Sequence, residues 1–321
     1  MIKTNILLRT TGFILAAAFF LIQGISAQSG DYVTFQHRNG KTKVKKGANR
    51  VVIFDIGSLE TYQELDIPVF GVTNSVPAYL PEYQSDRYQK LGSIMSPDLE
   101  ALRTANPDLI IISGRQIKVY QELSEIAPTV FLGTDPTNYW ESFEKNVRFI
   151  AEVHGKEALA EEKLAELRRK RDLVRAKTAT DDSRTFTIMH VRGGHTAYGK
   201  ESRFGFPHDV LGLREATSLD AQTHTGHRFK EGDGLVQKAN PDYVLLIDRD
   251  SAVGGGKRKP TDELLSDELK QTNALFRSRR CAFCRLYLTM LVLAGKVTPQ
   301  PTAQRHPNKQ DRQHNCSREK A

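Results

Sequence analysis

The sequence predicts an α/β protein of two lobes, each with a mainly parallel central sheet flanked by helices, joined by one long helix. Short apolar runs alternate with helical patterns through residues 50–133, which is typical of a parallel sheet covered on both faces. A highly charged run without Gly or Pro, residues 156–179, indicates one long connecting helix. Asn-Pro-Asp followed by an apolar strand occurs at residues 106–112 and again at 240–247, which indicates two similar lobes.

The elements of the first half can be predicted in order along the chain. Alternating residues 32–37 and the pair Asn39-Gly40 indicate a hairpin. Ser96-Pro97-Asp98 marks the start of a helix. The apolar runs predict strands at 50–55, 68–72, 108–113 and 128–133, and the helical patterns predict helices at 58–65, 96–106, 116–126 and 139–153.

The second half repeats this scheme. We expect a strand at 185–191, a helix that includes residues 208–213, and a helix and strand within 235–250. The domain boundaries that we predict are a signal peptide 1–27, an N-terminal lobe 28–140, connecting helices 141–180 that include the long one, an incomplete C-terminal lobe 181–276, and an aberrant, disordered tail 277–321.

The N-terminus has the pattern of a cleavable secretory signal. Lys3 and Arg9 precede an apolar segment, residues 12–22, and small residues 24–27 offer a cleavage site after Ala27. The apolar segment is shorter than the ~20 residues that a membrane span needs. We therefore expect a periplasmic protein.

The net charge of +8 and the pI near 9.3 belong to the C-terminal tail rather than to the folded body. Residues 277–321 carry ten Lys/Arg against two Asp/Glu, so residues 1–276 are neutral overall. This distribution argues against a nucleic-acid partner. The three cysteines, two of them in a Cys281-x-x-Cys284 pair, also lie in the tail, so the body folds without a disulfide.

Arginines follow the predicted strands where ligands bind in open parallel sheets, beyond the carboxyl ends. Arg115 follows the strand of the first Asn-Pro-Asp repeat, and Arg249 follows the strand of the second. Arg203 lies in a Gly-rich loop of the second half. Taken singly, each arginine also fits a surface salt bridge. Together they predict a cleft for a multiply anionic ligand, because guanidinium stays charged and donates two hydrogen bonds at once.

Two loop histidines are candidate metal ligands, and the absence of enzyme motifs favours a binding protein. His224 and His227 precede a second-lobe helix and could ligate a transition metal, although an ordinary polar loop fits them equally well. The chain has no G-x-G-x-x-G, P-loop or G-x-S-x-G motif, and no carboxylate pair spaced for acid–base catalysis. We therefore predict a binding protein rather than an enzyme, expected to be a monomer without an intrinsic cofactor.

Between Lys45 and Phe276 the chain resembles the periplasmic siderophore-binding proteins of ABC-type iron importers, the class with two lobes joined by one long helix. The likeness is greatest to the ferric-catecholate binders. The stretches that carry it are RVVIFDIGSLETYQEL, VPAYLPEY, LGSIMSPDLEALRTANPDLIIISGRQIKVYQELSEIAPTVFLG, AYGKESRFGFPHDVLG and NPDYVLLIDRD. The resemblance implies that the protein captures a ferric siderophore and delivers it to an inner-membrane ABC permease and its ATPase.

The resemblance also implies roles for particular residues. Arg115, Arg203 and Arg249 match an arginine triad that grips a tris-catecholate ferric complex. His227 matches a histidine that completes the iron shell, and His224 stays open because the family's His-Gly order is altered here. For permease docking, Glu100 fits the acidic residue of the first lobe, and Glu231 is an imperfect match for that of the second.

The C-terminus departs from the family after Phe276. Relatives continue with an apolar strand and a Trp-Tyr-Leu motif whose tyrosine ligates iron, and only Tyr287 offers a substitute here. The abrupt change in composition indicates a shifted reading frame, with a divergent C-terminus as the alternative. Loss of buried apolar surface predicts a less stable second lobe and weakened or absent binding. The alternatives for function are a binder of haem or another chelated metal, a module serving a sensor or receptor, and a non-functional truncated or frameshifted relative.

Overall fold

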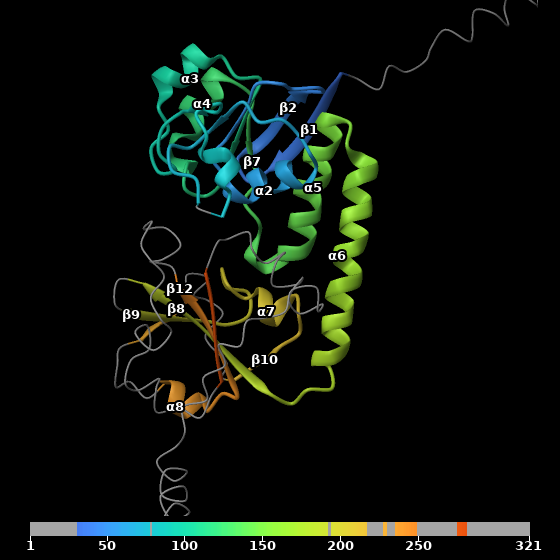
Figure 1. Cartoon of the computed structure of the whole chain (residues 1–321), viewed down its shortest axis with the longest axis vertical. Helices are drawn as coiled ribbons and strands as arrows, with labels where there is room; N and C mark the ends of the chain where they lie inside the picture. Colours follow the sequence, from blue (N-terminus) through green and yellow to red (C-terminus); the bar gives the residue numbers. More distant parts are fainter. Residues whose placement is uncertain are drawn as a thin grey trace, which may run out of the picture.

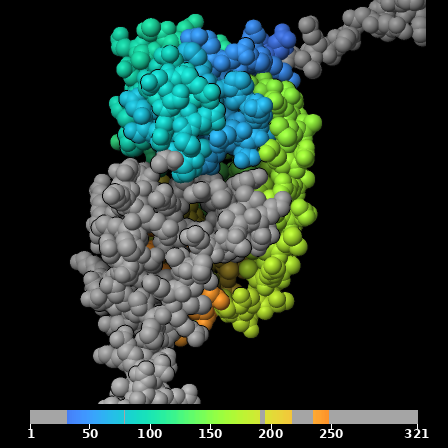
Figure 2. All heavy atoms as spheres, in the orientation of Figure 1, coloured from blue at the N-terminus to red at the C-terminus, as the bar shows by residue number. Residues whose placement is uncertain are grey.

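The computed structural model describes residues 31–77, 79–191, 194–216, 227–229, 235–248 and 275–280. They form two lobes joined by helix α6 (Glu157–Thr178), as the sequence predicts (Figure 1). In the space-filling view α6 lies along one side of the first lobe and extends beyond it (Figure 2). Its 22 residues correspond to about 33 Å at 1.5 Å per residue.

The N-terminal lobe is built on a five-stranded, all-parallel sheet in the order β5-β4-β3-β6-β7. Side chains of β6 alternate between two apolar clusters, so that Ile111 packs with α2 and α5 while Ile112 packs with α3 and α4. Both faces are covered, which is why this strand is apolar at every position. The strands are β3 (Val51–Ile53), β4 (Gly71–Val72), β5 (Gln89–Lys90), β6 (Leu109–Ile112) and β7 (Thr129–Phe131).

Capping aspartates explain where two helices of this lobe begin. Asp55 accepts a hydrogen bond from the backbone N–H of Ser58 at the start of α2, and Asp98 accepts one from Ala101 at the start of α3. The elements are α2 (Ile56–Glu64), α3 (Leu99–Ala105), α4 (Tyr120–Ile126) and the single-turn 3₁₀ helices η1 (Pro81–Gln84), η2 (Ile117–Val119) and η3 (Pro136–Asn138). The helix predicted at 116–126 is therefore η2 followed by α4.

The predicted N-terminal hairpin is present as β1 (Tyr32–His37) and β2 (Gly40–Lys45). His37 pairs with Gly40, so Arg38 and Asn39 form the turn, one residue earlier than predicted. Gly40 has φ +127°, a value that favours glycine. The apolar face of the hairpin packs on α5, where the rings of Phe35 and Phe149 lie 4.3 Å apart.

Helix α5 (Tyr139–His154) ends at Gly155, whose φ of 65° is the left-handed conformation of a helix C-terminus. The sequence assigned residues 141–180 to the connecting segment. The structure shows that α5 packs Val147 and Ile150 into the core of the first lobe, together with Leu164 of α6. The far part of α6 instead contacts α7 (Phe206–Asp209) of the second lobe, so the connector is anchored in both lobes.

The C-terminal lobe contains a mixed sheet in the order β11-β9-β8-β12-β13, with β10 pairing β8. β9 and β11 are antiparallel, whereas β10, β12 and β13 are parallel to their neighbours. The elements are β8 (Arg184–Val191), β9 (Gly194–Tyr198), β10 (Arg214–Glu215), β11 (His227–Phe229), α8 (Leu235–Ala239), β12 (Tyr243–Asp248) and β13 (Leu275–Arg280). α7 lies two residues earlier than the predicted helix start at residue 208.

The predicted boundary between this lobe and the tail, at Phe276, falls inside a strand of the sheet. β13 pairs with β12 and runs to Arg280, so the sheet continues across the predicted boundary at Phe276 into the tail. The predicted signal peptide 1–27 and the rest of the tail, including the cysteines, lie outside the described residues. Within the described residues, no helix is both long and apolar enough to span a membrane.

The first Asn-Pro-Asp motif is a joint between helix α3 and strand β6, at the amino edge of the sheet. Asn106 adopts φ 46° as the helix ends. The Oδ2 atom of Asp108 accepts backbone hydrogen bonds from Asn49 at 3.0 Å and Arg50 at 2.9 Å. Arg50 Nε in turn donates to the carbonyl of Ala105 at 3.2 Å. The motif thus ties the helix end to the start of the neighbouring strand β3.

The second motif forms the same joint in the other lobe. Asn240 has φ 42°, Asp242 Oδ2 accepts from the backbone N–H of Arg184 at 2.7 Å, and the Arg184 guanidinium donates to the Asn240 carbonyl at 2.9 Å. Each of these residues stands 134 positions after its counterpart in the first lobe. The repeat read from the sequence is therefore a repeated structure.

Candidate functional site

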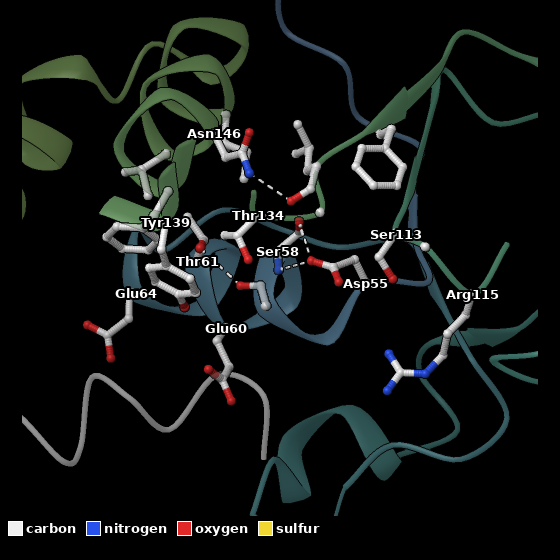
Figure 3. A pocket seen from close by; sticks show the side chains of 18 of the residues that line it. Asp55, Ser58, Glu60, Thr61, Glu64, Ser113, Arg115, Thr134, Tyr139 and Asn146 are labelled. Atoms are coloured by element: carbon white, nitrogen blue, oxygen red, sulfur yellow. Dashed lines mark hydrogen bonds between the residues drawn. The ribbon is translucent and has the colours of Figure 1, made fainter. Parts of the chain in front are cut away.

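A cavity of about 1080 Å³ lies where the first lobe faces α7 and the loop before it. Its walls include the carboxyl ends of β3, β6 and β7 and parts of α2 and α5 (Figure 3). Helix α6 and, from the second lobe, Arg203 and Phe206 complete the lining. This is the edge at which parallel sheets bind ligands. The cavity therefore lies at the edge that the sequence predicts.

Arg115 lies at this edge as predicted. β6 ends at Ile112, Ser113 and Gly114 turn the chain away from the sheet, and Arg115 extends half-buried into the cavity (Figure 3). Among the described residues it forms no ion pair or hydrogen bond. Its positive charge acts to lower the pKa of Asp55. None of the described residues therefore occupies the five N–H donors of Arg115, which suit an anionic ligand.

Asp55 is the charged neighbour of Arg115 on the cavity wall. It follows β3 and caps α2, accepting hydrogen bonds from the Ser58 backbone N–H at 2.8 Å and the Ser58 hydroxyl at 2.9 Å. Burial raises the pKa of Asp55, although the hydrogen bonds from Ser58 and Ser113 and the charge of Arg115 oppose that rise. Both hydrogen bonds from Ser58 reach the same carboxylate oxygen, Oδ2.

The second lobe contributes Arg203 to the same cavity. Arg203 is exposed, and its guanidinium lies 5.4 Å from the ring centroid of Phe204. The loop that carries it is compact: a Cβ atom on Gly205 would lie 2.4 Å from an oxygen of Asp209 and 2.8 Å from the Gly199 carbonyl. Glycine is therefore required for this loop to close beneath Arg203.

Charged side chains on the lining give the cavity a positive excess. The described cations outnumber the carboxylates by five to three, and one pair, Lys163 and Glu64, forms a salt bridge of 2.8 Å. The cations are Arg38, Arg115, Lys118, Lys163 and Arg203, and the carboxylates are Asp55, Glu60 and Glu64. This balance suits an anionic ligand.

An aromatic wall is the feature that sequence reasoning missed. Tyr139 and Phe206 cross between α5 and α7 with ring centroids 5.1 Å apart, and Trp140 and Phe143 line the cavity beside them. The helical spacing of Trp140 and Phe143 indicated only a core face. Their place on the cavity follows from how α5 docks against α7, and no local signal gives that.

Below this wall an ion-pair cluster holds α5 and α6 together. Glu144 accepts hydrogen bonds from Trp140 at 2.6 Å, from Arg168 at 2.7 and 2.8 Å, and from Arg148 at 2.9 Å. Burial alone would raise the pKa of Glu144, but these donors outweigh it and lower the pKa to about 2. The carboxylate thus stays charged and keeps Trp140 oriented.

The other predicted site residues are partly outside the described chain. Arg249, His224, Glu231 and Tyr287 lie outside it, so their roles stay predictions. His227 begins β11 and pairs with Ala197. Glu100 is exposed in the first turn of α3. Among the described residues, no three His, Cys, Asp or Glu side chains gather in a way that could hold a metal ion.

Comparison with protein families gives a match to the periplasmic binding protein model over residues 51–279. The chain belongs to this family. The match ends at residue 279, within β13.

Relatives with known structures share the two-lobe fold. Petrobactin-binding protein YclQ of Bacillus subtilis is 35% identical over 252 residues, which are 76% of this chain and 78% of the relative. Its crystal structure superposes with a TM-score of 0.75, covering 84% of this chain and all of that one. The catecholate-siderophore-binding protein VctP of Vibrio cholerae gives a TM-score of 0.71 at 30% identity, covering 76% and 88% of the two chains.

A second curated relative differs in its ligand name. Ferric-anguibactin-binding protein FatB of Vibrio anguillarum is 30% identical over 248 residues, 75% of this chain and 76% of the relative. The predicted fold class and the predicted family are therefore confirmed. The names of these relatives describe binding proteins rather than enzymes, and a further similar structure, PiuA of Streptococcus pneumoniae, is described as an iron uptake ABC transporter substrate-binding protein.

Proposed function

We propose that the protein is a periplasmic solute-binding protein that captures a ferric, catecholate-type siderophore and delivers it to an inner-membrane ABC importer. The observation that carries this proposal is that Arg115 of the first lobe and Arg203 of the second line one aromatic cavity of about 1080 Å³. The names of the relatives support an iron chelate as the ligand.

The chemistry of the cavity favours an aromatic anion over a neutral chelate. Planar guanidinium groups donate paired hydrogen bonds to anionic oxygens. The rings of Tyr139, Trp140 and Phe206 give the cavity an apolar lining that suits aryl groups. A tris-catecholate ferric complex combines both properties, since it presents aromatic rings around a multiply negative centre.

Further residues, several of them outside the described chain, complete the proposal. Arg249 would supply the third guanidinium, and His227, or His224 in its place, would ligate iron when the siderophore leaves positions open. Tyr287 is the weakest of the proposed ligands. We further propose that residues 1–27 are removed on export and that Glu100 and Glu231 dock the permease.

Fluorescence titration tests the ligand class directly. Trp140 is the single tryptophan of the chain and lines the cavity, so its emission reports on this site alone. We expect ferric catecholate to quench it strongly and ferric hydroxamate and haem to quench it weakly. Quenching by hydroxamate but not by catecholate would contradict the arginine argument, strong quenching by haem alone would favour the haem alternative, and no quenching by any chelate would favour a non-functional relative.

A transport assay tests delivery separately from capture. Glu100 is exposed in the first turn of α3 and does not line the cavity. Replacing it, Glu100→Gln, should leave the ferric catecholate affinity unchanged while reducing uptake of the radiolabelled complex. Unchanged uptake in this variant would remove Glu100 from the proposed docking surface.

A further inference from the structure

Met95 is exposed to an unusual degree for an apolar side chain. It is 66% exposed, more than the other large apolar side chains with high exposure, Leu173 at 54% and Tyr32 at 48%. Unlike these two, it lines the cavity, on the wall formed by the first lobe. An apolar side chain facing a binding cavity gains free energy when a ligand covers it.

The loop that carries Met95 is a hydrogen-bonded turn. Gly92 and Pro97 form a backbone bridge, and Ser93 and Ser96 exchange backbone hydrogen bonds of 2.9 and 3.2 Å across the turn. Gly92 has φ +101°, and a Cβ atom there would lie 2.3 Å from the backbone nitrogen of Asp98. The turn is therefore held closed, with Met95 at its tip.

A buried glutamine connects this turn to the arginine turn. Gln116 is completely buried, and its Oε1 atom accepts from the backbone N–H of Ser113 at 2.9 Å. Its Nε2 atom donates to the carbonyl of Ile94, next to Met95. One side-chain amide thus sets the position of Met95 relative to that of Arg115. The amide is satisfied on both sides, which makes the arrangement rigid.

We propose that Met95 is a specificity-determining contact that packs its thioether against an aryl ring of the bound chelate while Arg115 holds the chelate's charge. Gln116 is the positioning residue that fixes the Met95 turn relative to the turn that carries Arg115. This inference rests on the proposed function and deepens it, because it assigns recognition of the aryl group to a particular side chain. Citrate-type chelates, which have no ring, would lack this contact.

The physical basis is the match between a soft side chain and an aromatic surface. A methionine sulfur gains about 0.3–1.5 kcal/mol beside an aromatic ring, and its unbranched chain adapts to rings of different shape. The upper value corresponds to roughly tenfold in Kd. Arg115 recognises charge and so serves both aryl and citrate chelates. Met95 would therefore change the ratio of the two affinities.

Methyl NMR gives a direct test. The chain has four methionines, and the Met95 methyl resonance of ¹³C-methyl-labelled protein is identified by its loss in Met95→Leu. We expect the gallium(III) catecholate complex, which is diamagnetic, to shift this resonance upfield through the ring current, and gallium(III) citrate to leave it nearly unmoved. If the catecholate complex quenches Trp140 but leaves the Met95 resonance unmoved, this inference is wrong and the proposed function stands. If no chelate quenches Trp140, the proposed function itself fails.

Affinities of variants test selectivity. Met95→Ala should weaken ferric catecholate binding about tenfold and ferric citrate binding less than twofold. The matched control Leu173→Ala removes an exposed apolar side chain of α6 that does not line the cavity, and should change neither affinity. Equal losses for both chelates in Met95→Ala would overturn the inference.

The positioning role needs its own variant. Gln116→Leu keeps the bulk of the side chain but removes both hydrogen bonds, so we expect the catecholate-to-citrate affinity ratio to fall toward that of Met95→Ala. A purely structural role would lower both affinities in proportion. That outcome would remove Gln116 from the proposal, and the NMR result would still decide the role of Met95.

Discussion

The two lobes are alike at one edge of their sheets and different at the other. At the amino edge, Asp108 and Asp242 tie a helix end to the neighbouring strand in the same way. At the carboxyl edge, the first lobe has a purely parallel sheet ending in Asp55 and Arg115, whereas the second adds the antiparallel strands β9 and β11. The repeated edge maintains the fold, and the divergent edge carries the candidate site.

The largest expected effect tests whether the lobes are separate folding units. Ile112 of β6 and Leu246 of β12 occupy equivalent positions and are 0% and 1% exposed. Ile112→Ala and Leu246→Ala should each cost about 3 kcal/mol, because each leaves a cavity in its own core. Urea unfolding followed by far-UV circular dichroism should show that each substitution lowers a different transition.

The exposed substitution Glu125→Ala on α4 serves as the control and should change neither transition by more than about 0.5 kcal/mol. If both core variants lower one shared transition equally, the two lobes unfold as a single unit. The two lobes would then be separate in structure but not in their unfolding.

The next effect compares the two arginines, one from each lobe, that line the cavity. Arg115→Gln should weaken ferric catecholate binding by about 2 kcal/mol, since a half-buried guanidinium loses charged hydrogen bonds. Arg203→Gln should cost about 1 kcal/mol, because solvent screens an exposed charge more strongly. Isothermal titration calorimetry measures both, with Arg103→Gln on the exposed side of α3 as the control. A larger loss of binding free energy at Arg203 would show that the second lobe, rather than the first, contributes more to holding the ligand's charge.

The connector between the lobes should lose stability in acid. The pKa of Glu144 is lowered from its usual 4.5 to about 2, so the charged carboxylate stabilises the folded protein above pH 4.5 and loses that effect as the pH falls toward 2. Glu144→Gln should cost about 1–2 kcal/mol at pH 7, reduced by the exposure of its arginine partners. The difference between the variant and the wild type should shrink steadily below pH 4.5.

Glu161→Gln is the matched control for this prediction. Glu161 contacts the same two arginines but its side chain is 49% exposed, so its loss should cost about 0.5 kcal/mol or less. Equal effects of the two substitutions would show that the cluster acts as a surface network. A difference that stays constant from pH 7 to pH 2 would contradict the assignment to the Glu144 carboxylate.

The last effect, no larger than that of Glu144→Gln, tests the shared edge itself. Asp108 accepts two backbone hydrogen bonds and Asp242 one, so Asp108→Ala should cost about 1–2 kcal/mol and Asp242→Ala about 1 kcal/mol. Thermal unfolding is the measurement, and Asp86→Ala, which removes an exposed carboxylate elsewhere, is the control. No change in either variant would mean that the repeated motif is held by its backbone conformation alone.

Much of the fold could be predicted because its signals are local. The apolar run 109–112, the helix start at Asp98 and the charged run of α6 each depend on neighbours within a few residues. Boundaries were less accurate where tertiary packing sets them, as at α7, which the sequence placed at residues 208–213. The assignment of α5 to the connector failed to foresee its packing in the first lobe, since amphipathic spacing does not say which core a helix covers.

The sequence by itself determined the two-lobe α/β scheme, the repeated joint and the place of Arg115 at a strand end, because hydrophobic periodicity, capping and strand order are encoded in short stretches. Only the tertiary structure decided that Arg203 shares a cavity with Arg115, that Tyr139 and Trp140 form an aromatic wall beside them, and that Gln116 couples Arg115 to Met95. Those relations join segments far apart in the chain. They arise from how helices dock on sheets, which no local pattern contains.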